Sequence, residues 1–218
     1  MMSSESTRVA APEGEAAPAP ESAKRAQIIE GARRCFLASG FEAASMAEIA
    51  REAKVSKGTL YVYFDSKEAL FSALVEQSRR ASVERLMDFD YEHANVRDAL
   101  VHFATGLIGK LSAPEHVALV RMVIGASEKF PGVARDYFEA GPAHGAARLA
   151  GYLREQERLG MVSIPDIETA AWQFFGMCHH PTLISVLLAA RPAPDGERVR
   201  ILAETAVTTF LAAYATKR

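Results

Sequence analysis

Hydroxyl, ammonium and aromatic groups follow one another in SKGTLYVYF, residues 56–64, in an order that suits contact with DNA. On a helix, Leu60 and Phe64 would form the buried apolar side. The other side would be small, polar and aromatic, and it would consist of Gly58, Thr59, Tyr61, Val62 and Tyr63. A face of this kind, held by two other helices, is what a helix-turn-helix presents to the major groove.

Two short helices have to position that face. Ser45 can cap a helix that follows it, because Glu48 stands three residues later and completes a capping box. The chain is then expected to turn at residues 54–55, and Ser56 offers the next N-cap. The helix over residues 57–63 is too short to be stable alone, so its neighbours must hold it.

Longer helices are expected on both sides of this pair. A first helix over residues 22–39 would end at Gly40, a residue that readily adopts the left-handed cap conformation. A fourth helix begins at Ser66 and continues to Met87, long enough to link two domains as a lever. Tilting such a helix would move the helix-turn-helix that is expected to contact DNA.

The same residues match a known pattern in order. Residues 49–50, 55–64 and 66–70 resemble the signature of the TetR (TetR/AcrR-type) family of transcriptional regulators. The resemblance is strong over residues 22–70. More faintly, residues 121–159 resemble the AefR-like branch of that family.

The resemblance implies which residues would contact a double-stranded DNA operator. Serine and lysine at the helix starts and the two tyrosines would hold phosphates, and the small residues would meet bases. These expected contacts are Ser45, Met46, Ser56, Lys57, Gly58, Thr59, Tyr61, Tyr63 and Lys67. The alternative for each of them is a solvated surface position.

The charge balance argues against bulk, non-specific binding along nucleic acid. The 218 residues carry a formal net charge of −2, and residues 21–70 hold eight basic and seven acidic side chains. A DNA reader with this balance must place a few charges well. The candidates are Lys24, Arg25, Lys54, Lys57 and Lys67.

Composition and motifs exclude several other classes. Hydrophobic residues make up 49% of the chain, enough for a sizeable core. Neither a signal peptide nor about 18 consecutive apolar residues occur, so we expect a cytoplasmic protein without a membrane span. Cys35 and Cys178 are expected to be reduced. Enzyme motifs are missing, so we expect neither catalysis nor a cofactor, and a helical protein-interaction module is the alternative.

No strand-like alternation of useful length occurs, so the predicted fold is all-α with about nine helices. Residues 1–20 would form a disordered arm, 21–67 the three-helix DNA-binding domain, and 68–218 a larger helical domain for effector binding and dimerisation. In that larger domain we expect helices over residues 94–111, 115–129, 132–140, 144–159, 166–190 and 196–216.

The resemblance implies a pocket in the larger domain for a small-molecule effector. The candidate lining is aromatic and flexible apolar with a few polar tips, which favours an apolar or aromatic ligand. It comprises Phe103, Leu107, Met122, Tyr137, Trp172, Phe175 and His179. The alternative is that these residues are simply core. Residues 178–180, Cys-His-His, do not predict a metal site, because adjacent helical side chains diverge by about 100°.

The helix over residues 166–190 is apolar on opposite sides, so one side would cover the chain's own core and the other a second subunit. We therefore expect a homodimer, and the resemblance implies the same. The candidate interface residues are Phe174, Met177, Cys178 and Leu188, with Ala206, Phe210 and Tyr214 from the last helix. Two heads would read a near-palindrome, and the resemblance favours a repressor released by its effector.

Overall fold

The structure is a computed structural model that describes residues 20–87, 95–180 and 182–216. Of the predicted N-terminal arm, residues 1–19 lie outside the described residues. In the described residues every regular element is a helix, and the only strand-like pairing is one isolated antiparallel bridge, between Val162 and Ala215. The predicted all-α class is confirmed. None of the helices in this described part is both long and apolar enough to cross a membrane.

The helices follow one another with short connections. In chain order they are α1 Pro20–Ala43, α2 Met46–Glu52, α3 Lys57–Tyr63, α4 Lys67–Met87, α5 Val96–Ser112, α6 Pro114–Ala126, α7 Pro131–Phe138, the π-helix η1 Glu139–Ala143, α8 His144–Arg158, α9 Ile167–His179, α10 Thr182–Leu187 and α11 Gly196–Tyr214.

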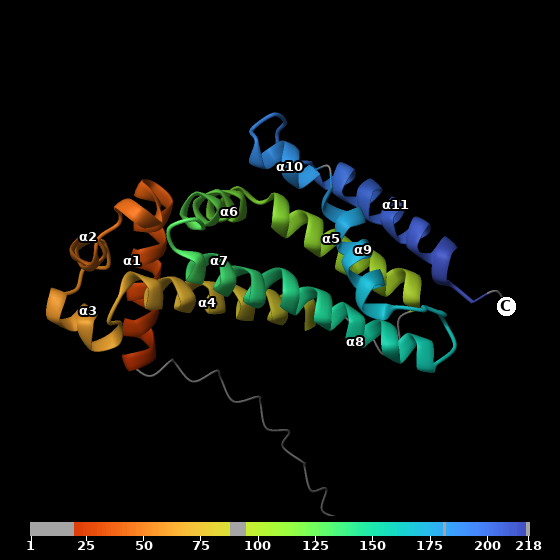
Figure 1. The fold of residues 1–218 in the computed structure, drawn as a ribbon, viewed down its shortest axis with the longest axis horizontal. Helices are drawn as coiled ribbons and strands as arrows, with labels where there is room; N and C mark the ends of the chain where they lie inside the picture. The colour runs from red at the N-terminus through yellow and green to blue at the C-terminus, as the bar shows by residue number, and fades with distance from the viewer. Residues whose placement is uncertain (1–19, 88–94, 181, 217–218) are drawn as a thin grey trace, which may run out of the picture.

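Helices α1, α2 and α3 form a small head at one end of the molecule (Figure 1). Their core contains Ile28, Ile49 and Leu60, each fully shielded from solvent, and the start of α4 adds Phe71. Residues of α6 and α7, among them Met122, join this same core. The head is therefore packed against the larger part of the molecule as well as tethered to it by α4.

A second core lies at the opposite end and is built by α5, α8, α9 and α11. Aromatic rings fill its centre: Phe174 lies edge-on to Phe210 at 5.1 Å between ring centroids, and Phe103 lies 5.7 Å from Phe175. The buried aromatic contacts explain why four helices from distant parts of the chain converge here.

The regular part of the first helix ends at Gly40 as predicted, because this residue takes a non-helical φ of 80° and ψ of 164°. A further short helical turn follows as far as Ala43, so Gly40 forms a kink between the two. Two other expected boundaries need correction. The helices expected over 132–140 and 144–159 are joined by η1, which accommodates Pro142 inside a widened turn.

The helix expected over 166–190 is divided into α9 and α10. His180 ends α9 with an extended backbone, φ −95° and ψ 134°. The residue that follows it in the sequence is Pro181, and a proline disfavours the helical conformation of the residue before it. The sequence-based expectation allowed a kink here, but the helix ends instead.

Candidate DNA-binding face and effector domain

The predicted capping box at the start of α2 is present. The Ser45 amide donates to the Glu48 carboxylate at 3.0 Å, and the Glu48 amide donates to the Ser45 hydroxyl oxygen at 3.3 Å. The hydrogen bond from the Ser45 hydroxyl to this carboxylate lowers the pKa of Glu48. Two backbone donors at the helix start are thus partnered, which fixes where α2 begins.

A left-handed residue makes the turn between α2 and α3. Lys54 has φ 54°, and its amide donates to the carbonyl of Arg51 at 3.1 Å. The amide of Val55 reaches back to the carbonyl of Ala50 at 3.0 Å. This pair of bonds is the Schellman pattern that ends helices, here with lysine in the position that glycine usually occupies.

Helix α1 holds the end of α2 in place. The side-chain amide of Gln27 donates to the carbonyl of Ala53 at 2.6 Å, and Arg34 donates to the carbonyl of Glu52 at 3.0 Å. The two helices are so close at Gly31 that a Cβ there would lie 2.6 Å from the Cβ of Ala53. Only glycine permits this approach.

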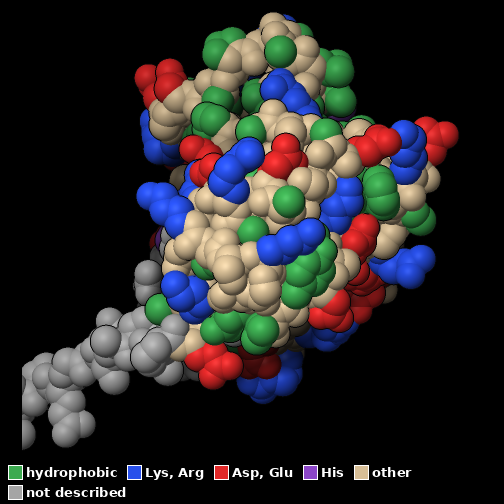
Figure 2. Space-filling model, turned by 90° about the vertical axis from the view of Figure 1, so that its left-hand side faces the viewer, with side chains coloured by type: hydrophobic (Ala, Val, Ile, Leu, Met, Phe, Trp, Pro, Cys, Tyr) green, Lys and Arg blue, Asp and Glu red, His purple; other side chains and the backbone are tan. Residues whose placement is uncertain are grey.

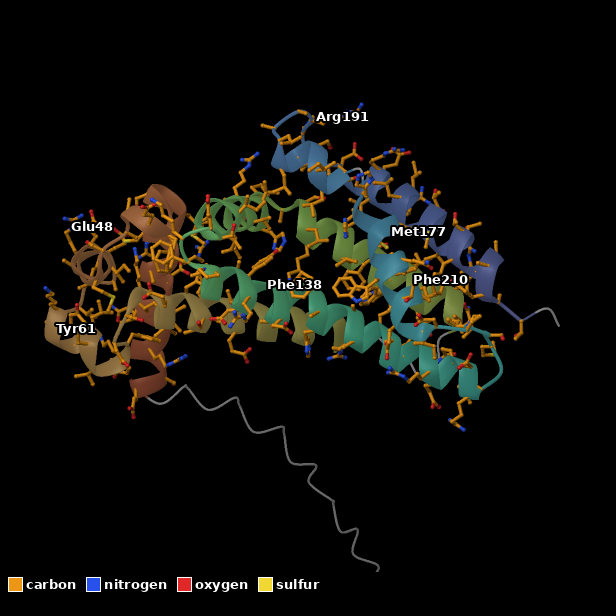
Figure 3. All side chains as sticks on the ribbon, in the orientation of Figure 1. Glu48, Tyr61, Phe138, Met177, Arg191 and Phe210 are labelled. Carbon is orange, nitrogen blue, oxygen red and sulfur yellow. The ribbon has the colours of Figure 1, made fainter. Side chains whose placement is uncertain are left out.

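Helix α3 is held by its apolar side, and most of its other residues are exposed, although Tyr63 is half-buried. Leu60 is fully buried and Phe64 nearly so, whereas Tyr61 is 47% exposed and Val62 81% exposed. Ser56 caps the helix by accepting from the amide of Thr59 at 3.0 Å. Figure 3 shows Tyr61 at the outer end of the head, far from Met177 and Phe210 in the larger part.

Nothing inside the protein requires a glycine at position 58. The residue is exposed, and an added Cβ would meet only the Ser56 hydroxyl oxygen, at 3.8 Å, which is an ordinary contact. Since glycine also weakens a helix interior, a partner outside the chain gives the better reason for it. Lys57 beside it is exposed as well.

Other side chains that were predicted to contact DNA already have bonding or packing partners within the protein. The Thr59 hydroxyl shares a 2.7 Å hydrogen bond with that of Ser56. Met46 and Tyr63 are half-buried and pack against the head core. The Lys67 ammonium donates to the carbonyls of Phe41 and Glu42, each at 2.9 Å. DNA contact by these residues stays a prediction, and Lys67 would have to share an ammonium that is already bonded.

Charges on the head are mixed rather than segregated. Figure 2, which views the molecule from the head end, shows basic and acidic side chains interspersed. Arg33 pairs with Glu30, and Arg34 pairs with Glu52, both on α1 and its boundary with α2. These pairs neutralise the charges of Arg33 and Arg34. The exposed Lys54 and Lys57 are therefore the better candidates for contact with phosphate.

The structure brings only part of the predicted effector-lining set together. Phe103, Leu107 and Phe175 belong to the core of the larger end, and the ring of Trp172, which is 43% exposed, lies 6.1 Å from that of Phe175. Trp172 is also stacked on Phe138 at 6.0 Å, and His179 is half-buried. Met122 and Tyr137 instead pack with the head core. The set therefore spans both cores.

A polar pair lies between α6 and α7. The Tyr137 hydroxyl and the His116 Nε2 are 3.2 Å apart. Burial, with a smaller effect of the Lys110 charge, lowers the pKa of His116 to about 4, and burial raises the pKa of Tyr137 to about 12. Both groups are therefore neutral at physiological pH, so the pair can only offer neutral hydrogen bonding.

Most of the predicted interface residues lie inside the chain's own core. Phe174, Cys178, Ala206 and Phe210 are almost fully buried in the single chain. Periodicity predicted two apolar sides of α9 without deciding which of them meets a partner. Phe174 lies on the side that faces the chain's own core, because its ring contacts Phe103 and Phe210. Burial also raises the pKa of the Cys178 thiol to about 12.

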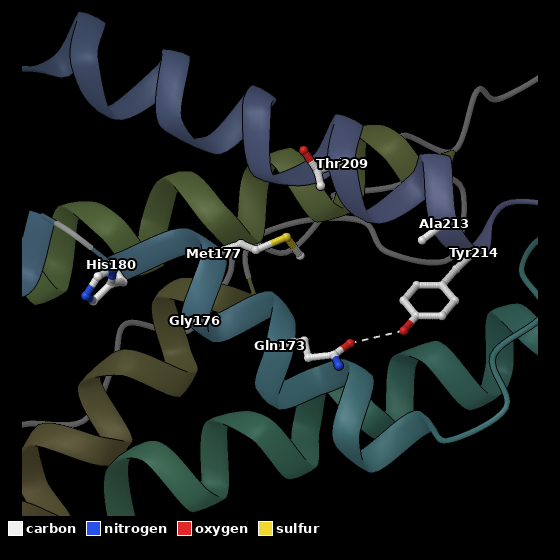
Figure 4. A pocket seen from close by; sticks show the side chains of 7 residues that line it. All are labelled: Gln173, Gly176, Met177, His180, Thr209, Ala213 and Tyr214. Atoms are coloured by element: carbon white, nitrogen blue, oxygen red, sulfur yellow. Dashed lines mark hydrogen bonds between the residues drawn. The ribbon is translucent and has the colours of Figure 1, made fainter.

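The outward side of α9 faces an open groove along α11 (Figure 4). This groove has a volume of about 600 Å³ and is lined by Gln173, Gly176, Met177, His180, Thr209, Ala213 and Tyr214. The Tyr214 hydroxyl donates to the Gln173 side-chain oxygen at 3.1 Å across it. Two predicted interface residues, Met177 and Tyr214, therefore line the groove, and Leu188 lies exposed just beyond α10.

Comparison with known proteins decides the family. Residues 28–74 match the model of the tetR family of bacterial regulatory proteins, and residues 98–216 match that of the AefR-like transcriptional repressor C-terminal domain. The chain belongs to the TetR family. It is a DNA-binding transcriptional regulator with an AefR-like larger domain, and both predicted resemblances are confirmed.

Solved structures share the fold over most of the chain. A TetR-family transcriptional regulator from Mesorhizobium loti has a TM-score of 0.82 at 26% identity, with 91% of this chain and 100% of that chain covered. The flavonoid-responsive regulator FrrA has a TM-score of 0.77 at 31% identity, with 90% and 100% covered.

Sequence relatives match over part of the chain. The repressor Rv1474c of Mycobacterium tuberculosis is 30% identical over 147 residues, which are 64% of this chain and 70% of that protein. Other curated TetR-type relatives match over shorter segments, and the chain spans only 26% of the length of one and 33% of another.

One exposed residue of α3 was not among the predicted DNA contacts. Val62 is the most exposed of the large hydrophobic side chains in the described residues, and it lies one helical turn beyond Gly58. An apolar residue that helical spacing turns away from Leu60 and Phe64 was the signal that could have found it. A valine so placed could touch a thymine methyl group.

Proposed function

We propose that this TetR-family regulator is a homodimeric repressor that reads a near-palindromic operator with α3 and leaves it when a small-molecule effector binds. The observation that carries the proposal is the outer face of α3. Lys57, Gly58, Tyr61 and Val62 are exposed there and do little for the chain's own core, while Leu60 and two neighbouring helices hold the helix rigidly.

The division of labour on this face follows from residue chemistry. Ser45 and Ser56 lie at helix starts, where free backbone amides and a hydroxyl suit a phosphate. Lys57 and Tyr61 would bind phosphates beside them, and Thr59 would meet a base edge. Phosphate partners would position the head, and the few base contacts would specify the sequence.

The groove between α9 and α11 supports the homodimer. Met177 and Tyr214 give it apolar surface, and Gly176 and Ala213 are small enough to let another helix approach. Two copies facing each other there would form a four-helix seam. It would set the two heads roughly 34 to 36 Å apart, or a multiple of that distance, so that each reads one half-site.

An apolar or aromatic effector is supported by the aromatic residues at the larger end, including the exposed Trp172 and Phe138. The structurally similar protein FrrA is a flavonoid-responsive regulator, and flavonoids are aromatic compounds. Release from DNA would require that the effector bind the DNA-incompetent arrangement of the heads more tightly than the competent one.

A selection from random-sequence duplexes tests the proposal, followed by mass measurement of the protein alone and of its complex. We expect a near-palindromic consensus, a dimer at micromolar protein concentration, and one dimer per duplex. An enriched pool without a consensus would favour a helical protein-interaction module instead. A monomer at micromolar concentration would exclude the homodimer.

A further inference from the structure

The head and the larger part of the molecule meet at an aromatic cluster around one ammonium group. Phe41 comes from the end of α1, Lys67 from the first turn of α4, and Phe130 from the turn between α6 and α7. The Lys67 ammonium lies 4.8 Å from the ring centroid of Phe41 and 5.1 Å from that of Phe130. The two rings touch edge to face, with centroids 5.0 Å apart and planes at 73°. We call these three residues the joint.

Hydrogen bonds also hold the Lys67 ammonium in this position. It donates to the carbonyls of Phe41 and Glu42 at 2.9 Å each, with that of Ala44 at 3.5 Å. A cation at the end of a helix is favoured because it partners carbonyls that have no helical donor. Two ring faces add cation–π attraction to the same group. Lys67 therefore ties α4 to the end of α1.

Phe130 links the joint to α6 and α7 of the larger part of the molecule. Its amide donates to the carbonyl of Ala126 at 2.8 Å, and its carbonyl accepts from the amide of Val133 at 3.0 Å. Ala126 and Val133 are both buried. The turn that bears the ring is thus fixed at both ends, so the position of α6 and α7 is transmitted to the ring.

Neighbouring contacts differ in strength. Lys129, next to Phe130 in the chain, pairs with Glu42 at 2.5 Å, but both side chains are more than half exposed. Exposed pairs of this kind contribute little. Ser72 on α4 donates to Asp136 on α7 beside the joint. The aromatic contact of Phe130 with Phe41 and Lys67 is thus the more shielded link, and Lys129 provides a matched neighbour outside it.

From these contacts we infer that Phe130 and Lys67 are positioning residues which set the angle of the DNA-reading head relative to the larger domain. Without the joint, α4 and the remaining packing would have to hold that angle alone. The inference rests on the proposed dimer, because the angle of each head decides the distance between the two copies of α3. A fixed angle would restrict the protein to one spacing of half-sites.

The test compares duplexes that differ only in half-site spacing. The probes are the duplex enriched by the wild-type protein from the random pool, the same duplex with one base pair inserted at its centre, and a single half-site. Wild type should prefer the selected spacing by roughly tenfold or more, about the effect of a mismatched base pair. In Phe130→Ala that ratio should fall to about threefold or less, because a loosely held second head gains less from the correct spacing.

Affinity for the single half-site separates positioning from folding. A variant that only destabilises the head would weaken binding to all three duplexes alike and keep the spacing ratio. We expect Phe130→Ala to keep its half-site affinity while it loses the ratio. Lys129→Ala should keep both, and Phe130→Leu should restore part of the ratio. Thermal melting of each variant shows that it is folded at the assay temperature.

Two negative results have different meanings. If the wild-type protein binds both spacings with equal affinity, the proposal of a dimer that binds two half-sites is wrong. The proposed role of the joint is then wrong as well. If wild type discriminates and Phe130→Ala discriminates equally well, the dimer stands and the joint does not position the head.

Discussion

Helices α3 and α9 use their residues in opposite ways. Helix α3 buries Leu60 and exposes most of the others, so its sequence is largely free to suit a partner outside the chain. Helix α9 buries five residues, including Phe174 and Phe175, and shows only a narrow strip to the groove beside α11. Substitutions on α3 should therefore separate DNA binding from stability, whereas most substitutions on α9 should affect stability first.

The largest effect is expected inside α9. Phe174→Ala removes a fully buried ring from between Phe103 and Phe210, and should lower the free energy of unfolding by about 3–5 kcal/mol. Urea unfolding at two protein concentrations measures it. Met177→Ala, on the groove side, is the matched variant: it should cost each chain less, and its effect should depend more on protein concentration, because Met177 lines the proposed dimer seam. A Phe174→Ala protein within about 1 kcal/mol of wild type would show that this ring does not hold the core.

Acid should destabilise the packing of α6 against α7 through His116. The pKa of this residue is about 4 in the folded protein, and an unfolded histidine has a pKa near 6.5. Between these values the unfolded chain binds more protons, so stability falls as the pH falls, by about 3 kcal/mol across the window. Above pH 6.5 the group has no effect.

Urea unfolding at pH 7, 6, 5 and 4 measures that loss, and His116→Gln isolates it. Glutamine can still bond to the Tyr137 hydroxyl but does not titrate in this range. The variant should lose less stability than wild type as the pH falls. Identical pH dependence in the two proteins would mean that His116 titrates normally and is not shielded from water.

On α3 we expect a substitution to lower DNA affinity while it raises the stability of the fold slightly. Gly58→Ala should reduce affinity for the selected duplex by roughly tenfold, because the methyl group enters the space where the groove wall comes close. Stability should rise by about 0.5–1 kcal/mol, since alanine favours a helix and the position has room for a Cβ. Anisotropy titration and thermal melting measure the two quantities. Unchanged affinity would remove Gly58 from the interface.

The smallest effect is a change in preference rather than in affinity. Thr59→Val keeps the shape of the side chain but removes the hydroxyl that bonds to Ser56. Affinity for the selected duplex should fall by about fivefold or less, since one single contact is worth less than a bidentate pair. A new random-sequence selection should show altered preference at one position of each half-site. The same consensus from both proteins would assign Thr59 to capping alone.

The head could be predicted because its signals are local. Ser45 with Glu48, and Ser56 with Thr59, fix helix starts within four residues, and Leu60 fixes which side of α3 is buried. The larger end could not be predicted to the same depth. Periodicity shows that α9 has two apolar sides, but the choice between them depends on Phe103 and Phe210, which lie far away in the sequence.

The outcomes at two prolines and at Lys67 also depended on packing that the sequence alone does not show. Pro142 was expected to start a helix and lies inside η1, whereas the chain before Pro181 leaves the helix altogether. Packing of the neighbouring helices decides between these outcomes. Lys67 was expected to reach a phosphate, and only the structure shows its ammonium between two rings contributed by distant segments.

The most direct test of the account is fluorescence anisotropy of the purified protein with two duplexes at roughly physiological salt. One is the duplex selected from the random pool, and the other is its scrambled sequence. We predict about a thousandfold or greater preference for the selected duplex, the separation typical of specific recognition. Equal and weak binding to both duplexes would contradict the claim that the outer face of α3 reads a DNA sequence.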